Sequence, residues 1–269
     1  MRKTKSISVT SGKGGVGKTS FSINFSYELV NQGYKVLLVD CDFGLANIDI
    51  MLNLSVAHTL EEVLLGKVAM TDAIIEFKKG FDVLPASSGI PEIADMDVEK
   101  QKIFIKHIAD IQDNYDFLIF DTGAGIHKSV LRISASADYV IVVTNPEPTT
   151  ITDAYTIMKI LRSNYKISAF KLVVNQSSIE AAMKVKKLLY SVAQENGVLY
   201  KLDLLGAIPR DSLVSNALNR RQLWHSLNSN AKCVVSLNDI AIALLGGDKE
   251  NIQPQSNKFG FWKKWLLDP

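Results

Sequence analysis

A glycine-rich loop near the start of the chain has the composition of a phosphate-binding site. Residues 12–19 read Gly-Lys-Gly-Gly-Val-Gly-Lys-Thr and fill every fixed position of the pattern GxxxxGK[ST]. Glycines let backbone N–H groups turn toward phosphate oxygens, the Lys18 ammonium pairs with the β- and γ-phosphates, and the Thr19 hydroxyl can ligate Mg²⁺. We therefore predict a nucleoside triphosphate and Mg²⁺ site here. Its binding residues are Gly12, Gly14, Gly15, Val16, Gly17, Lys18, Thr19 and Ser20.

Three aspartates at the ends of apolar runs are candidates for the chemistry at these phosphates. Asp40 and Asp42 lie two residues apart after the run 36–39, so their side chains can face the same way. Asp121 follows the run 117–120, where a carboxylate suits binding of Mg²⁺ through water. The alternative for Asp40 and Asp42 is a pair of solvated loop acids.

The elements that must position these residues alternate between strand-like and helix-like patterns. Several apolar runs are continuous rather than alternating, as in strands covered on both faces. The order predicts an α/β fold, the P-loop NTPase class, with a doubly wound, mostly parallel sheet and helices on both faces. Asp40, Asp121, Thr144 and Asn175 then meet at one edge of the sheet. The strand-like runs are 7–9, 36–39, 81–84, 117–120, 139–143, 171–174 and 204–208, and the helical patterns are 18–31, 97–111, 150–163 and 179–195.

Length and composition point to a soluble, cytoplasmic globular protein. The chain has 269 residues, of which 47% are hydrophobic and 22% charged, so a sizeable core is available. A net charge of +2 is too small to indicate a nucleic-acid partner. Cys41 and Cys233 have no metal-binding spacing, and no window reaches the ~18 apolar residues of a membrane span. We expect one ATPase domain over residues 1–245.

The second lysine of the loop resembles a family signature. The run Lys-Gly-Gly-Val-Gly-Lys-Thr is similar to the deviant Walker A motif of the MinD/ParA family of ATPases. The resemblance implies that Lys13 acts in trans on the nucleotide of a partner subunit in an ATP-bound homodimer. It also implies that Asp42 positions the attacking water and that Asp40 belongs to the magnesium shell or supports the loop. The alternative for Lys13 is a solvated surface lysine.

The base-binding segment favours adenine over guanine. Guanine-specific enzymes carry Asn-Lys-x-Asp after a late strand, whereas residues 175–178 read Asn-Gln-Ser-Ser. Asn175, together with Pro209 and Asp211 of the turn at 208–211, resembles the adenine pocket of the family. We therefore expect ATP and Mg²⁺ as the cofactors, with Pro209 alternatively a simple turn residue.

Two further segments resemble one branch of the family, the flagellar-number ATPases (FlhG, also FleN or YlxH). They are residues 42–52 and 84–90. The resemblance implies a slow, regulatory ATPase that controls flagellar number and placement. The implied partners are the flagellar GTPase FlhF and proteins of the flagellar switch (C-ring) or of transcription regulation. A MinD-like division-site regulator and a ParA-like partitioning ATPase are the alternatives, and so is an iron–sulfur carrier, although Cys41 and Cys233 are badly placed for a cluster.

The end of the chain predicts membrane association. Residues 246–257 read as a polar linker, and residues 258–269 as an amphipathic membrane-targeting segment. At ~100° per residue the bulky apolar side chains share one face, and tryptophan with lysine favours the membrane interface. Two copies in a dimer would bind lipid better than one, which makes the location reversibly peripheral at the inner face of the cell membrane. The alternative is a helix that packs on its own domain. The lipid-facing residues are Phe259, Phe261, Trp262, Trp265 and Leu266.

Overall fold

The computed structural model describes residues 4–42, 47–86 and 98–246. The strands are β1 (Lys5–Ser11), β2 (Val36–Cys41), β3 (Ile75–Lys78), β4 (Phe81–Leu84), β5 (Phe117–Ala124), β6 (Tyr139–Thr144), β7 (Ala169–Asn175) and β8 (Lys201–Ile208). The helices are α1 (Lys18–Asn31), α2 (Ile48–Leu52), α3 (Leu60–Leu64), α4 (Met70–Ala73), α6 (Val98–Ile111), the 3₁₀ turn η1 (Gln112–Asn114), α7 (Lys128–Ser136), α8 (Pro148–Tyr165), α9 (Ile179–Glu195), α10 (Ser212–Arg220), α11 (Trp224–Leu227) and α12 (Lys232–Gly246).

The strands form one sheet in the order β3-β4-β2-β5-β1-β6-β7-β8. Every neighbouring pair is parallel except β3 and β4, which form an antiparallel hairpin at one edge. Asp40 of β2 and Val9 of β1 both pair with Asp121 of β5. This register brings the carboxyl ends of β1, β2 and β5 together, and the phosphate-binding loop follows β1 at that edge.

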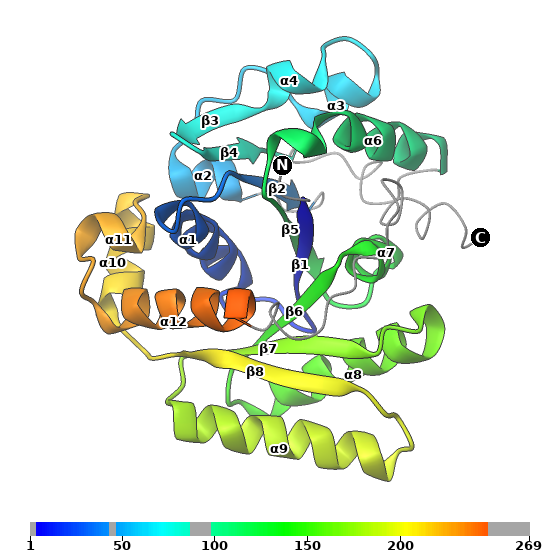
Figure 1. The fold of residues 1–269 in the computed structure, drawn as a ribbon, viewed down its shortest axis with the longest axis vertical. Coiled ribbons are helices and arrows are strands. Elements are labelled where there is room, and N and C mark those ends of the chain that lie inside the picture. Colours follow the sequence, from blue (N-terminus) through cyan, green and yellow to red (C-terminus); the bar gives the residue numbers. More distant parts are fainter. Residues whose placement is uncertain (1–3, 43–46, 87–97, 247–269) are drawn as a thin grey trace.

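Helices cover both faces of the sheet (Figure 1). One face packs against α1, α10, α11 and α12, and the other packs against α3, α4 and α6 at one end and α7, α8 and α9 at the other. Successive strand residues serve opposite cores: Val36 and Leu38 face α1, whereas Leu37 and Val39 face α6, and all four are fully buried. Continuous apolar strands are therefore explained by burial on both faces.

The predicted fold class is confirmed. Helices were expected at 18–31 and 179–195 and have those bounds in the structure. Helix α12 packs into the core, since its residues Val234, Leu237 and Ile240 are buried. The linker after Gly246, the segment 258–269, residues 43–46 and residues 87–90 lie outside the described residues, so the predictions made for them stay predictions.

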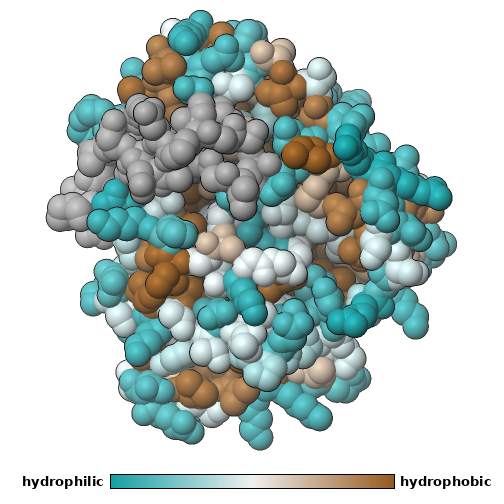
Figure 2. Space-filling view, turned by 180° about the vertical axis from the view of Figure 1, so that it is seen from behind, coloured by the Kyte–Doolittle hydropathy of each residue, from teal (hydrophilic) through white to brown (hydrophobic). Residues whose placement is uncertain are grey.

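Some large apolar side chains are exposed on the described surface, among them Ile50, Leu199 and Ile242. On the face seen in Figure 2, apolar side chains form separate patches among hydrophilic residues. Within the described ranges, no helix combines the length and the apolar character needed to cross a membrane.

Candidate active site

The phosphate-binding loop connects β1 directly to α1 and leaves its backbone open to a ligand. Gly15 and Gly17 have φ values of 80° and 89°, in the left-handed region that favours glycine. Gly12 lies against α8, where a Cβ would overlap the backbone of Asp153. A Cβ at Gly17 would overlap the side-chain amide of Asn175. The backbone of the loop is thus closely packed at both ends, at Gly12 against α8 and at Gly17 against Asn175. The N-terminus of α1 faces the position of the ligand.

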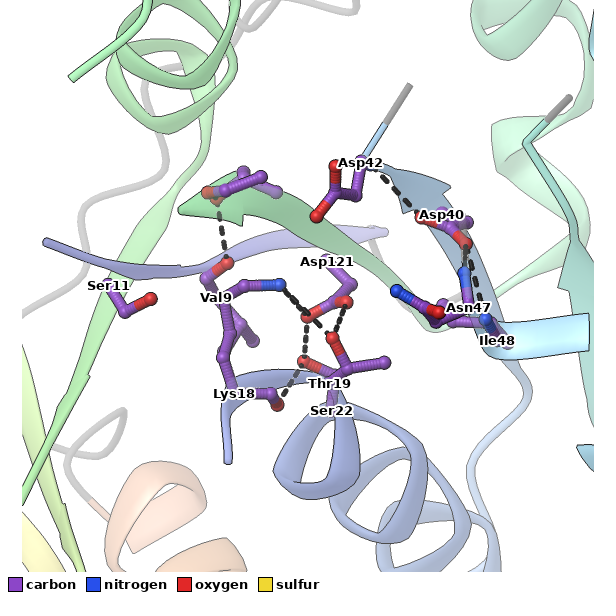
Figure 3. Close-up of polar contacts among 12 residues, drawn as sticks. Val9, Ser11, Lys18, Thr19, Ser22, Asp40, Asp42, Asn47, Ile48 and Asp121 are labelled. Carbon is purple, nitrogen blue, oxygen red and sulfur yellow. Dashed lines mark hydrogen bonds and ion pairs between the residues drawn. The ribbon is translucent and has the colours of Figure 1, made fainter. Parts of the chain in front are cut away.

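Lys18, Thr19 and Asp121 converge at the base of the loop (Figure 3). The Lys18 Nζ lies 2.9 Å from Asp121 Oδ1, and Thr19 Oγ1 donates to Asp121 Oδ2 at 2.7 Å. The side chains of Lys18 and Asp121 are only 7% and 1% exposed, so little solvent screens this pair. The ammonium that the motif assigns to phosphate and the hydroxyl that it assigns to Mg²⁺ are therefore held beside a buried carboxylate.

Sequence reasoning missed a fourth member of this cluster, Ser22. Its Oγ lies 2.6 Å from Asp121 Oδ1 and 3.0 Å from the Lys18 carbonyl. Thr19 and Ser22 are three residues apart on α1 and so share one face of the helix. This spacing of three residues from Thr19 is the sequence signal that could have identified Ser22.

The Asp40 carboxylate accepts hydrogen bonds from backbone N–H groups that precede and follow residues 43–46. Its Oδ1 accepts from the backbone N–H of Asp42 at 3.0 Å, and its Oδ2 accepts from those of Asn47 at 3.2 Å and Ile48 at 3.3 Å. Burial and the nearby Asp121 carboxylate raise the pKa of Asp40 to about 7, although the backbone donors at Asp42 and Ile48 and the Lys18 ammonium oppose the shift. These bonds favour loop support over the magnesium shell as the role of Asp40, and the metal role stays a prediction.

Asp42 lies beside the glycine that follows the magnesium candidate Asp121. A Cβ at Gly123 would be 3.6 Å from Asp42 Oδ1 and 3.5 Å from Val130. In Figure 3 the Asp42 side chain is drawn near the end of β5, above the cluster around Asp121. A carboxylate can orient a water for attack, which is the role that the family resemblance implies for Asp42, and this role stays a prediction.

Lys13 stands apart from this cluster. Its exposed ammonium donates to Thr149 Oγ1 at 3.1 Å, at the N-terminal end of α8. The two lysines of the loop therefore point to different surroundings: Lys18 is buried on Asp121, and Lys13 is on the surface.

The predicted base-pocket residues lie at the ends of β7 and β8. Asn175 pairs with Ile208, which precedes Pro209. The Asn175 amide donates to the Val16 carbonyl at 2.8 Å, so it also supports the phosphate-binding loop. Asp211 caps α10 by accepting from the Leu213 N–H at 2.9 Å. A cavity of about 360 Å³ is lined by Pro209 and by the N-terminal residues of α9 and α12. Base binding by Asn175, Pro209 and Asp211 stays a prediction.

The described residues contain no cluster of three or more histidine, cysteine or acidic side chains suited to a metal ion. Mg²⁺ in nucleotide sites usually keeps several waters and binds one or two protein groups together with the phosphates. The pair of Thr19 and Asp121 fits that kind of site.

Comparison with known proteins places this geometry in a family. A family model described as an AAA domain matches residues 4–177. The antiactivator FleN of Pseudomonas aeruginosa is 31% identical over 90% of this chain and 86% of its own, and the flagellum site-determining protein YlxH of Helicobacter pylori is 31% identical over 88% and 81%. The septum site-determining protein MinD of Pyrococcus horikoshii, solved with Mg-ADP, superimposes with a TM-score of 0.74 at 27% identity, covering 93% of this chain and 100% of that one.

The phosphate-binding loop with its second lysine, the buried Asp121 and the eight-stranded sheet agree with these matches. The chain belongs to the MinD/ParA family of P-loop ATPases, in which FleN and YlxH are among its relatives.

Proposed function

We propose that this ATPase is a nucleotide-controlled switch that regulates flagellar number and placement. The observation that carries the proposal is the cluster of Lys18, Thr19 and Asp121 at the phosphate-binding loop, in a chain whose relatives FleN and YlxH are named for flagellar functions. A switch needs a site that binds ATP and hydrolyses it slowly, because the nucleotide state is the signal.

Within this site each residue has a separate task. Backbone N–H groups of residues 12–17 and the Lys18 ammonium bind the phosphates of ATP, and Thr19 and Asp121 hold the magnesium shell, directly and through water. Mg²⁺, when bound, neutralises charge on the β- and γ-phosphates. Asp42 orients the water that attacks the γ-phosphorus, and the products are ADP and phosphate. Asp40 fixes the backbone on both sides of residues 43–46 and thereby the position of Asp42.

ATP binding drives formation of a homodimer, in which Lys13 reaches the nucleotide of the partner. The exposed position of Lys13 supports this role, since among the described residues its ammonium donates only to a neutral hydroxyl, that of Thr149, at the protein surface. Such a solvent-exposed bond contributes little compared with the pairing of an ammonium and a triphosphate. Hydrolysis removes the γ-phosphate and returns the chain to the monomer.

The ATP dimer binds the inner face of the cell membrane through residues 258–269. The apolar residues Phe259, Phe261, Trp262, Trp265 and Leu266 enter the lipid interface, and two copies give the avidity that one lacks. In this state the dimer acts on its flagellar partners, which we propose to be the GTPase FlhF and proteins of the C-ring or of transcription regulation.

Liposome co-sedimentation tests the membrane step. The full chain and a truncation after Asn257 are mixed with vesicles that contain anionic lipid, in MgATP or MgADP. We expect the full chain to pellet in ATP and much less in ADP, and the truncated chain to stay in the supernatant in both. Pelleting in ATP that survives truncation would refute the assignment of residues 258–269.

Flagellar counts test the biological role. In the organism that encodes the chain, deletion of the gene should change the number or position of flagella seen by electron microscopy, and the wild-type gene should restore them. The second candidate is regulation of the division site, favoured by the similarity to MinD. Normal flagella together with misplaced septa in the deletion strain would favour that candidate instead.

A further inference from the structure

Ser22 is a fully buried serine in the middle of the ATP site, and none of the tasks described above uses it. It lies one turn after Thr19 on α1 and is 0% exposed. Its Oγ has two acceptors in reach: the Asp121 carboxylate at 2.6 Å and the Lys18 carbonyl at 3.0 Å. The hydroxyl has a single proton, and the shorter contact to a charged oxygen is the stronger bond. Ser22 therefore donates to Asp121 Oδ1.

One of the other two partners of Asp121 must leave it when nucleotide is bound. Lys18 and Thr19 bond to Asp121 in this structure, but the phosphates require the Lys18 ammonium. The Thr19 oxygen would turn a lone pair to the metal ion while its proton stays available to Oδ2. Ser22 lies one turn further along α1 and is fully buried, and Figure 3 shows its hydroxyl between the Asp121 carboxylate and the Lys18 carbonyl. Its bond to Asp121 can thus persist while the ion pair of Asp121 with Lys18 is exchanged.

We propose that Ser22 is a positioning residue for the magnesium site. By binding Oδ1 it fixes the plane of the Asp121 carboxylate and leaves Oδ2, the oxygen that now accepts from Thr19, directed at the metal shell. Partners of this kind orient metal-binding carboxylates in other sites. The inference rests on the proposal that Asp121 belongs to the magnesium shell.

A purely structural role is the alternative, and α1 contains a matched control for it. Ser26 lies one turn further along the same helix, is also fully buried, and donates to the Ser22 carbonyl at 2.7 Å. That is a bond of a hydroxyl back to the preceding turn, which serines in buried helices commonly make. Ser26 has the environment of Ser22 without the bond to Asp121.

Equilibrium binding of a fluorescent ATP analogue to the full chain separates these roles. Affinity is measured first in EDTA and then as a function of Mg²⁺ concentration. For Ser22→Ala we expect affinity in EDTA within about twofold of wild type, and a Mg²⁺ midpoint raised roughly tenfold, the lower end of the loss typical for such partners. Ser22→Cys fills the same space with a slightly larger sulfur but donates poorly, so it should show a similar shift. Ser26→Ala should keep the wild-type midpoint.

Asp121→Asn distinguishes failure of this inference from failure of the magnesium site itself. If Asp121→Asn responds to Mg²⁺ like wild type, the assignment of Asp121 is wrong and the role of Ser22 falls with it. If Asp121→Asn loses the response while Ser22→Ala and Ser22→Cys keep the wild-type midpoint, the positioning role alone is overturned. An equal shift in Ser26→Ala would also overturn it, since the effect would then come from helix packing.

Discussion

Replacement of Asp40 by asparagine should make the protein more stable relative to wild type as the pH is raised from 5 to 8. The pKa of Asp40 is raised from 3.8 to about 7 because the carboxyl is buried and faces Asp121. A carboxyl whose pKa is higher in the folded than in the unfolded state favours folding while it is protonated. That contribution is therefore full below pH 4 and is lost as pH rises toward 7.

The size of the effect follows from these two pKa values. Ionisation of Asp40 costs the folded state about 2 kcal/mol at pH 5 and about 4 kcal/mol at pH 8, at about 1.4 kcal/mol for each pKa unit. Asparagine does not ionise, but it loses at least one of the bonds from the N–H groups of Asp42, Asn47 and Ile48, at about 1.5–3 kcal/mol. The free energy of unfolding of Asp40→Asn relative to wild type should thus rise by about 2–3 kcal/mol from pH 5 to pH 8.

Urea denaturation in EDTA without nucleotide measures this difference, because bound metal would change the charge around Asp40. Both proteins are unfolded at pH 5 and at pH 8, and the two differences are compared. At pH 8 we expect Asp40→Asn to be at least as stable as wild type and yet to hydrolyse ATP more slowly, since Asp42 has lost its support. A difference in stability that stays within about 0.5 kcal/mol between the two pH values would refute the reasoning.

Three further substitutions test separate parts of the site. Gly12→Ala should lower the melting temperature by several degrees, because the new methyl overlaps the backbone of Asp153, and such overpacking costs about 1–3 kcal/mol. The control is Gly14→Ala, whose Cβ meets nothing within 4 Å and which should melt like wild type. Equal melting temperatures of the two variants would contradict the close approach of Gly12 to Asp153. Lys18→Ala should weaken binding of ATP at least about 100-fold in calorimetry, since it removes a buried cation from the phosphates, and near-normal affinity would show that the loop binds without it. Lys13→Ala should bind ATP nearly as well as wild type but remain monomeric in gel filtration, and an ATP-dependent dimer of this variant would exclude the role in trans.

Much of the fold could be predicted because its signals are local. The run 36–39 is apolar at every position, which indicates a strand covered on both faces, and helix α1 follows the phosphate-binding loop with the expected bounds. The short helices α2, α3 and α4 gave no such signal, since each has five residues or fewer and is stabilised by packing rather than by a long periodic pattern. The hairpin partner β3 has only four residues and is half exposed.

The residues of the site also differ in whether a local sequence signal identifies them. Lys18 and Thr19 could be assigned because their motif is contiguous, and Asp121 because it directly follows the apolar run 117–120, although strand β5 continues beyond it to Ala124. Ser22 could not, because its role depends on a carboxylate 99 residues away. For Asp40 the family resemblance left two roles open, the magnesium shell and support of the loop. The sequence could not decide between them, since the partners of Asp40 are backbone N–H groups whose positions are set by the path of the chain between β2 and α2.

The molar mass of Asp42→Ala in solution, measured by gel filtration with light scattering in MgATP and in MgADP, tests the nucleotide switch most directly. One chain has a mass of 29.7 kDa. If Asp42 orients the attacking water, the variant binds ATP without hydrolysing it and should persist at twice this mass in ATP, while it stays at the mass of one chain in ADP. A variant that binds ATP and yet has the mass of one chain in both nucleotides would contradict the account.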